Sequence, residues 1–298
     1  MSETDRAPAV SVVVPCYNGG QYIDRVLASL AGQTFRDFEI IVVDDGSTDA
    51  ATVEKLASLP ASVHVIRQEN RGLSGARNTG FREARAELVL PLDCDDEIEP
   101  SFLATTVSAM TAAPKNVGVV FTHIRLSGAA DGDLERHFHP FDLLFANGIP
   151  SCALIRKSVW MEIGGYDEAM REGYEDWEFF LRMALHGYDG VEIAKPLFIY
   201  NMESGGMLLG QSSPAHVRLW RYMRQKHRDA YRLSSILRRW RNTRSRPGKV
   251  SLWKGLLALV LAKVLPDALF GRLVAARRSR RFMRSNDLGT GGSAAARP

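Results

Sequence analysis

Short apolar runs alternate with amphipathic stretches along the first third of the chain. The first run is rich in β-branched residues and ends at Pro15, which is typical of a buried parallel strand. The four runs are Val10–Val14, Phe38–Val43, Val63–Ile66 and Leu88–Leu92. The stretches between them place apolar residues at helical spacing. This order predicts an α/β fold, with an open, mostly parallel sheet and helices on both faces.

The pattern loosens beyond residue 96. Further strands are expected at Val117–Leu126, Pro150–Ile155 and Leu197–Tyr200, and a strong helix at Tyr174–His186. From His216 onward the chain is helical in pattern and rich in arginine. These changes predict four regions in the chain. They are a flexible N-terminus (1–8), a main domain (9–215), a basic helical extension (216–284) and a disordered tail (285–298).

The charge of the chain is divided unevenly. The 298 residues carry a formal net charge of +4, and 45% of them are hydrophobic, which suits a globular protein. Residues 1–215 hold 17 Lys and Arg against 31 Asp and Glu, whereas residues 216–284 hold 20 against two. An acidic body with a basic extension indicates that the extension meets a polyanion.

The cysteines and the first residues bear on the compartment. Cys16, Cys94 and Cys152 are odd in number and far apart, so they favour a reducing environment over a disulfide framework. The polar start, MSETDRAPAV, has neither the basic nor the apolar region of a secretory signal. We therefore expect a cytoplasmic protein.

Carboxylates follow two of the four predicted strands. Asp44 and Asp45 come after the second strand, and Asp93 and Asp95 after the fourth. The carboxyl ends of strands in an open α/β sheet form the edge where ligands bind. Asp93-Cys94-Asp95 can hold a divalent cation, Mn²⁺ or Mg²⁺, with positions left for phosphate oxygens, or it can be an acidic turn before a helix. Asp44 and Asp45 can accept bonds from a base or a ribose, or serve a turn.

Two further stretches carry candidate chemistry. Glu175, Asp176 and Trp177 begin the predicted helix, where a carboxylate can act as a general base but is also favoured by the helix dipole. Trp177 offers an apolar face to a sugar or to the core. The Gly-rich stretch at 70–78 contains Arg71 and Arg77, and such a loop before a helix suits phosphate binding.

These pieces, in this order, resemble the family-two glycosyltransferases with a GT-A fold. The matching stretches are VSVVVPCYNGGQYI, EIIVVDDGSTD, ENRGLSGARNTG, LPLDCDD and GGYDE…GYEDWEFFLR, within residues 9–205. The resemblance implies an enzyme that takes a sugar from a nucleotide-sugar donor, with UDP as the expected nucleotide. The acceptor would be a hydroxyl of a glycan or lipid-linked glycan in cell-surface polysaccharide or glycoconjugate synthesis.

The same resemblance assigns roles to individual residues. Pro15, Tyr17 and Asn18 would line the nucleotide pocket, and Asp45, with Asp44, would contact the base. Asp93 would face the ribose or the metal, and Asp95 the metal. Asp176 would be the base of an inverting, single-displacement transfer, Glu175 would orient its neighbours, and Trp177 would border the acceptor. Where many relatives have Tyr-Arg-x-His, this chain has Tyr200-Asn201-Met202-Glu203, so Glu203 is the candidate third metal ligand.

The apolar run at 251–265 lies between arginine clusters at 238–246 and 277–284. A membrane span needs about 20 apolar residues, and this run is shorter and interrupted by lysines. It reads as an interfacial helix on an anionic membrane surface, which would make the protein peripheral on the inner face of the membrane. Alternatively it packs on the main domain. Nucleic acid is not an expected partner, since few aromatic residues accompany the arginines.

Two other functions compete with glycosyl transfer. A nucleotidyltransferase would also use a doubly wound sheet and carboxylates, but it would carry a phosphate-gripping basic residue after the first strand, where this chain has Cys16-Tyr17-Asn18-Gly19-Gly20. A catalytically silent scaffold would be expected to have lost at least one of the acids Asp45, Asp93, Asp95 and Asp176. The sequence therefore favours the metal-dependent glycosyltransferase.

Overall fold

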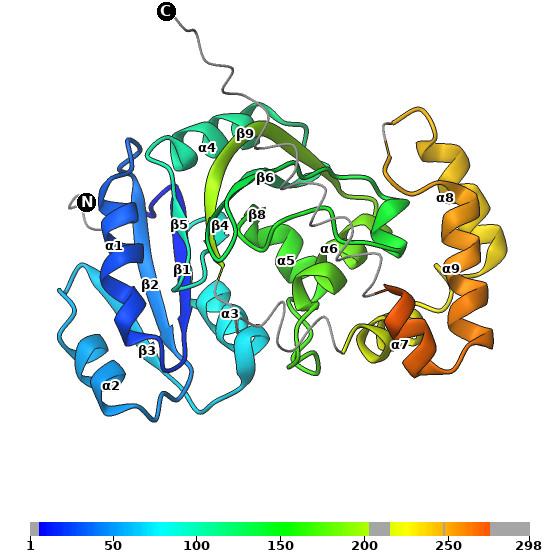
Figure 1. Ribbon diagram of the computed structural model, residues 1–298. Helices are drawn as coiled ribbons and strands as arrows, with labels where there is room; N and C mark the ends of the chain where they lie inside the picture. The colour runs from blue at the N-terminus through cyan, green and yellow to red at the C-terminus, as the bar shows by residue number, and fades with distance from the viewer. Residues whose placement is uncertain (1–5, 203–214, 247, 275–298) are drawn as a thin grey trace, which may run out of the picture.

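The computed structural model describes residues 6–202, 215–246 and 248–274, and nine strands in these ranges form one twisted sheet (Figure 1). The strand order is β3-β2-β1-β4-β8-β6-β9-β5, with β7 paired to β6 off this path. The strands are β1 (Val10–Cys16), β2 (Phe38–Asp44), β3 (Val63–Arg67), β4 (Leu88–Pro91), β5 (Glu97–Ile98), β6 (Val117–Gly128), β7 (Gly132–Leu134), β8 (Leu154–Arg156) and β9 (Asp189–Met202).

The first four strands in this order are parallel, as the apolar runs predict. β1 lies between β2 and β4 and is buried along its whole length. The register places Cys16 opposite Asp44, and Leu92 N donates to Val13 O at 2.9 Å. Because the registers are aligned, the residues that follow β1, β2 and β4 meet at one edge of the sheet.

Helices cover both faces of the sheet. One core cluster joins the sheet to α1 (Ile23–Ala31), α2 (Ala50–Ala57) and α4 (Phe102–Ala112). The other joins it to α3 (Gly72–Glu83), α5 (Lys157–Ile163) and α6 (Glu175–Leu185). The predicted α/β class, with a sheet between helical layers and helices added at the C-terminal side, is confirmed (Figure 1).

The last strand differs most from its prediction. The expected strand was Leu197–Tyr200, whereas β9 runs over Asp189–Met202 and pairs in parallel with β6. Its first eight residues are half-buried or exposed and include polar residues and Pro196, so no apolar run marks them. The register between the two long strands is irregular around His123, where β9 contains the additional residues.

Helices of the C-terminal region pack against the body of the protein. They include α7 (His216–Lys226), α8 (Leu233–Thr243) and α9 (Leu252–Val264), with a further helical segment at 267–274. They contact the short 3-10 helix η3 (Asp142–Leu144), where Trp220 Nε1 and Tyr231 Oη donate hydrogen bonds to Leu144 O at 3.0 and 2.8 Å. Leu219, Trp220, Met223 and Ile236 also join the core cluster of α3, α5 and α6. Apolar packing therefore continues past the predicted boundary at residue 215.

Helix α9 has two apolar sides with different surroundings. Gly255 is buried close to the Phe145 ring, and Leu256 and Leu259 pack on the core. On the other side, Trp253 is 78% exposed and Val264 71%. One side of the helix therefore packs on the main domain, and the other side is exposed to solvent. Among the described helices, none combines the length and hydropathy needed to cross a membrane. The predicted tail at 285–298 and residues 1–5 lie outside the described residues.

Helix α3 approaches β1 so closely that one position must be glycine. A Cβ atom added at Gly80 would lie 2.2 Å from Val13 Cγ1. We expect Gly80→Ala to lower the free energy of unfolding by about 1–3 kcal/mol through overpacking, measured by urea denaturation. Val13→Ala in the same chain should offset part of this loss. Gly32→Ala is the control, since its nearest neighbouring atom is 3.4 Å away; an equal loss in both variants would contradict this account.

Candidate active site

The acids after β2 form a buried turn that holds the next loop. Asp45 accepts hydrogen bonds from Gln68 Nε2 at 2.6 Å, from Arg71 N at 2.9 Å and from Gly72 N at 2.8 Å. Asp44 accepts from Ser47 N at 2.8 Å, and both carboxylates are 2% exposed. The two carboxylates predicted to contact a base therefore shape the edge of the sheet, and Asp45 fixes the N-terminus of α3.

Asn18 ties the loop after β1 to the start of α2. Its backbone adopts the left-handed conformation, with φ at 51°, which asparagine tolerates better than most residues. Its Oδ1 accepts from Thr48 N and Asp49 N at 2.8 and 3.0 Å. Beside it, Pro15 is buried within β1, whereas Tyr17 is 51% exposed. Of the three predicted pocket residues, Tyr17 has the side chain that reaches solvent most.

Arg77 joins the acid turn after β4 to the start of α6. Its guanidinium is buried, with Nη2 at 2.7 and 3.0 Å from the two oxygens of Asp93 and Nη1 at 2.6 Å from Glu175 Oε1. The charges of Asp93 and Glu175 raise the pKa of Arg77 in spite of its burial. The structure thus places Arg77 beneath the site, where it positions two acids, rather than in the phosphate-binding loop that the sequence predicts.

The turn after β4 gathers carboxylates. Arg25 Nη2 and Asn201 Nδ2 donate to the backbone oxygen of Asp95 at 2.7 and 2.9 Å, which fixes the turn. Burial, with the charges of Asp95 and Asp93, raises the pKa of Asp96 well above its ordinary value. The buried Asp96 Oδ2 has no hydrogen-bond partner in the described part of the chain. Clustered carboxylates with an unsatisfied oxygen fit a divalent cation, which would relieve their repulsion. The predicted ligand Glu203 lies outside the described residues.

The start of α6 holds the predicted base. Tyr174 precedes it in the left-handed conformation, with φ at 66°, a strained state for an aromatic residue. Asp176 Oδ2 accepts from Asn147 Nδ2 at 2.9 Å, and Oδ1 accepts from Trp177 N at 2.7 Å. Burial raises the pKa of Asp176, and Arg77 opposes this shift. Burial also raises the pKa of Glu175 to about 7.

Two residues near Asp176 have no counterpart in the sequence prediction. Asn147 binds its carboxylate, and the charge of Arg136 acts on it. Burial lowers the pKa of Arg136, and its Nε has no hydrogen-bond partner among the residues described. Both come from the irregular segment between β7 and β8, where no periodic pattern marks them; one basic residue in an otherwise acidic stretch is the signal that the sequence offers for Arg136.

Trp177 and Arg71, the remaining residues predicted to contact a ligand, each bind another part of the protein. Trp177 is 2% exposed, and its Nε1 donates to Leu143 O at 2.7 Å, so its indole lies in the core and shows little surface to a ligand. Arg71 is paired with Glu168, at 2.7 and 2.9 Å from its two oxygens, on the outer side of the α3 N-terminus. A ligand phosphate would have to compete with Glu168 for Arg71.

The site therefore combines an acid turn, an exposed tyrosine and the acids Glu175 and Asp176, whose pKa values are raised by burial. Arg77 links the first acid group to the second through Asp93 and Glu175. Such an arrangement can bind a phosphate ester through a cation and remove a proton from a hydroxyl next to it.

Comparison with known families and proteins gives a consistent result. The model of the family described as "Glycosyl transferase family 2" matches residues 11–164. An uncharacterized glycosyltransferase of Haemophilus influenzae is 32% identical over 185 residues, which are 58% of this chain and 61% of that protein. The chain spans between 16% and 61% of the length of the first curated relatives that it matches.

Solved structures share the fold. TarS 1-349 of S. aureus, in complex with UDP-GlcNAc, has a TM-score of 0.61 and 20% identity, covering 95% of this chain and 93% of that one. The mannosyltransferase PcManGT from Pyrobaculum calidifontis, in complex with GDP-Man and Mn²⁺, has a TM-score of 0.52 and 19% identity, covering 95% and 87%. At these identities the likeness extends to the fold alone.

The raised pKa of Glu175 makes stability depend on pH. Between its ordinary value of 4.5 and about 7, the folded chain keeps a proton on Glu175 that the unfolded chain has lost. This group therefore stabilises the fold fully below pH 4.5 and progressively less as pH rises to about 7. In Glu175→Gln, the free energy of unfolding should fall less steeply over this range, by up to about 1.4 kcal/mol per pH unit, measured by urea denaturation. Identical slopes for the variant and the wild type would contradict the assignment.

Proposed function

Because the chain belongs to glycosyl transferase family 2, we propose that it transfers a sugar from a nucleotide-sugar donor to a hydroxyl of a glycan or lipid-linked glycan. UDP is the proposed nucleotide, and the product would enter cell-surface polysaccharide or glycoconjugate synthesis. The family match favours this activity over nucleotidyl transfer. Support for the donor comes from TarS, a neighbour in fold that was solved with UDP-GlcNAc.

The observation that carries the proposal is the pairing of the acid turn and the α6 start through Arg77. Asp93 and Glu175 are 82 residues apart in the chain, yet both lie within 3.0 Å of one guanidinium. A donor at the carboxyl edge of β1, β2 and β4 would place its nucleotide along Tyr17 and the turn of Asp44 and Asp45. Its sugar would then lie between the acid turn and Asp176.

Asp176 is the proposed general base. The acceptor hydroxyl gives its proton to the Asp176 carboxylate while its oxygen bonds to the anomeric carbon of the donor sugar. The bond between that carbon and the phosphate oxygen breaks, and its electron pair leaves with the nucleoside diphosphate. Attack from the side opposite the leaving group inverts the anomeric centre. Asn147 orients the Asp176 carboxylate. The raised pKa of Asp176 makes this carboxylate a better proton acceptor than that of an exposed aspartate.

A divalent cation, Mn²⁺ or Mg²⁺, is proposed at Asp93 and Asp95. When bound, it would supply positive charge to the diphosphate of the donor. Arg77 already offsets part of the charge of Asp93, and Asp95 is proposed as the other anionic ligand of the turn. The Mn²⁺ complex of PcManGT supports a metal in a neighbour of this fold.

These roles predict separable defects. Asp176→Asn should lower transfer by roughly 10²–10⁴-fold but leave donor binding intact, since it removes the base alone. Asp95→Ala should abolish donor binding that depends on Mn²⁺ or Mg²⁺. Nucleotide release from a panel of UDP- and GDP-sugars, with each metal and with chelator, measures turnover, and thermal shift measures donor binding.

Glu54→Gln, an exposed acid on α2, is the matched control and should behave as the wild type. If the wild type shows neither turnover nor a metal-dependent shift with any donor, the catalytically silent scaffold becomes the better description. Equal turnover by Asp176→Asn and the wild type would remove Asp176 as the base.

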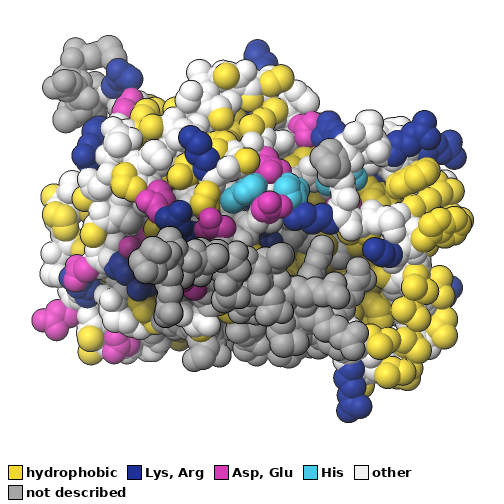
Figure 2. Space-filling model, turned by 45° about the horizontal axis from the view of Figure 1, so that its top comes forward, with side chains coloured by type: hydrophobic (Ala, Val, Ile, Leu, Met, Phe, Trp, Pro, Cys, Tyr) yellow, Lys and Arg dark blue, Asp and Glu magenta, His cyan; other side chains and the backbone are white. Residues whose placement is uncertain are grey.

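We further propose that α9 attaches the protein to an anionic membrane surface, as a peripheral protein on the cytoplasmic face. Figure 2 shows hydrophobic side chains gathered over the C-terminal helices, with Lys and Arg around them. The exposed side of α9 is an apolar stripe at helical spacing, formed by Trp253, Leu257, Val260 and Val264. Lys254 and Lys263 are exposed beside it. An apolar stripe flanked by lysines suits the boundary between acyl chains and acidic headgroups. The arginine cluster at 277–284 lies outside the described residues.

Replacing the stripe should weaken attachment. Burying one such side chain is worth about 1.5–3 kcal/mol, so Trp253→Ser with Leu257→Ser should reduce partitioning onto anionic vesicles at least about tenfold. Vesicle flotation measures this, with neutral vesicles to separate the charge contribution. Met161→Ser, at an exposed apolar position on α5, is the control. Equal flotation of the double variant and the wild type would exclude the stripe as the attachment surface.

A further inference from the structure

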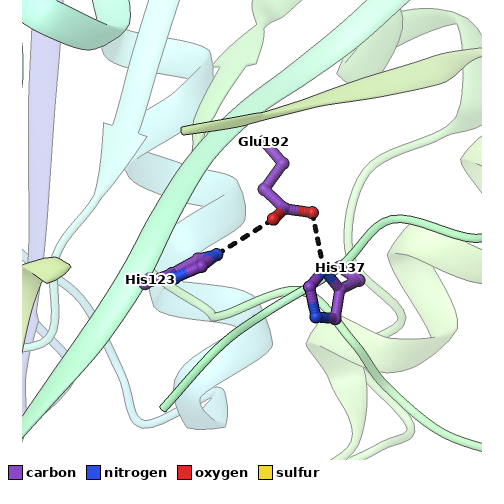
Figure 3. Close-up of side chains that lie close together, drawn as sticks. All are labelled: His123, His137 and Glu192. Carbon is purple, nitrogen blue, oxygen red and sulfur yellow. Dashed lines mark hydrogen bonds and ion pairs between the residues drawn. The ribbon is translucent and has the colours of Figure 1, made fainter. Parts of the chain in front are cut away.

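Two histidines and a glutamate form a cluster that the proposed reaction does not use. His123 comes from β6, His137 from the segment after β7, and Glu192 from β9 (Figure 3). His123 Nε2 lies 2.9 Å from Glu192 Oε1, and His137 Nδ1 lies 2.8 Å from Glu192 Oε2. Three chain segments thus place their ligand-type atoms within 4.8 Å of one another.

The cluster can be reached by solvent. The side chains of His123, His137 and Glu192 are 13%, 30% and 28% exposed. Figure 2 shows histidine side chains at the surface next to acidic ones. Among the described residues, no other group of three His, Cys, Asp or Glu side chains converges in this way.

Both ring nitrogens of His137 face carboxylates. One ring nitrogen, Nδ1, points to Glu192, and the other, Nε2, lies 3.5 Å from Glu135 Oε2. A histidine that binds a metal through one nitrogen commonly faces a carboxylate or carbonyl with the other, which fixes the ring and its tautomer. The ring planes of His123 and His137 are inclined at 80°, with centroids 5.9 Å apart. They approach Glu192 from different directions, as ligands around an ion do.

We propose that His123, His137 and Glu192 bind one divalent transition-metal ion, with Zn²⁺ as the best match. Two imidazoles and one carboxylate suit Zn²⁺, whereas Mg²⁺ and Ca²⁺ take oxygen ligands. Three protein ligands leave a coordination position for water. This site is distinct from the acid turn at Asp93 and Asp95 and does not depend on the proposed transfer reaction.

The ion would tie the segment between β7 and β8 to the sheet. His137 N donates to Gly148 O at 2.9 Å, so the segment folds back on itself at the cluster. The next residues on these two paired stretches are Arg136 and Asn147, which act on Asp176. A bound ion would therefore fix the backbone that presents Arg136 and Asn147 to the proposed base.

Zn²⁺ binding to the full-length, chelator-treated protein tests the site. We expect one equivalent of Zn²⁺ to compete with a chromophoric chelator, and Co²⁺ to give the d–d absorption of a four- or five-coordinate site. His123→Gln and His137→Gln should each weaken Zn²⁺ binding at least about tenfold. His64→Gln, at an exposed position on β3, and Asp95→Ala should bind as the wild type. Wild-type affinity in both histidine variants, or no stoichiometric binding by the wild type, would overturn the proposal.

A measurement on the wild type alone guards against variants that fail to fold. Zn²⁺ should slow the modification of His123 and His137 by diethyl pyrocarbonate at least about tenfold, read residue by residue by mass spectrometry, because a ligating nitrogen cannot react. His64 should react at the same rate with and without Zn²⁺. Unchanged rates at His123 and His137 under saturating Zn²⁺ would exclude them as ligands.

Discussion

Asp93 follows strand β4 and Glu175 begins helix α6, and the buried guanidinium of Arg77 bridges them. Burying a charge is costly unless it is paired, and here one cation faces two carboxylates. Removing Arg77 would leave both acids uncompensated, and removing either acid would leave the cation partly so. The turn after β4, the N-terminus of α6 and the helix that carries Arg77 are therefore linked by the two ion pairs of one guanidinium.

Polar side chains also fix two helix starts at this edge of the sheet. Asp45 holds the N-terminus of α3, and Asn18 holds the N-terminus of α2. Each of these side chains satisfies backbone N–H groups that a helix start would otherwise leave unpaired. These hydrogen bonds fix the loops at the edge of the sheet, where Tyr17 and the acid turn are the proposed contacts of a ligand.

The sequence predicted the parallel half of the sheet well, because β1, β2, β3 and β4 are short runs dominated by apolar residues that alternate with helical patterns. It shortened β9, whose half-buried residues around Pro196 lack such a run. It assigned Arg77 to phosphate because a basic residue in a Gly-rich loop usually faces a ligand. The signal against this was its place three residues before Gly80 and four before Phe81, on the buried side of α3. Arg136 and Asn147 lie in irregular chain, where tertiary contacts alone bring them to Asp176.

The two-sided packing of α9 has a geometric consequence. Its inner side rests near Phe145, next to the segment whose Leu143 and Leu144 carbonyls receive the indoles of Trp177 and Trp220. Trp177 directly follows Asp176, so packed residues connect α9 to the proposed base. If α9 rests on a bilayer, its packing on the body of the protein sets the distance between the lipid surface and the proposed base. Only acceptors whose hydroxyl lies at that distance from the lipid would then be reached.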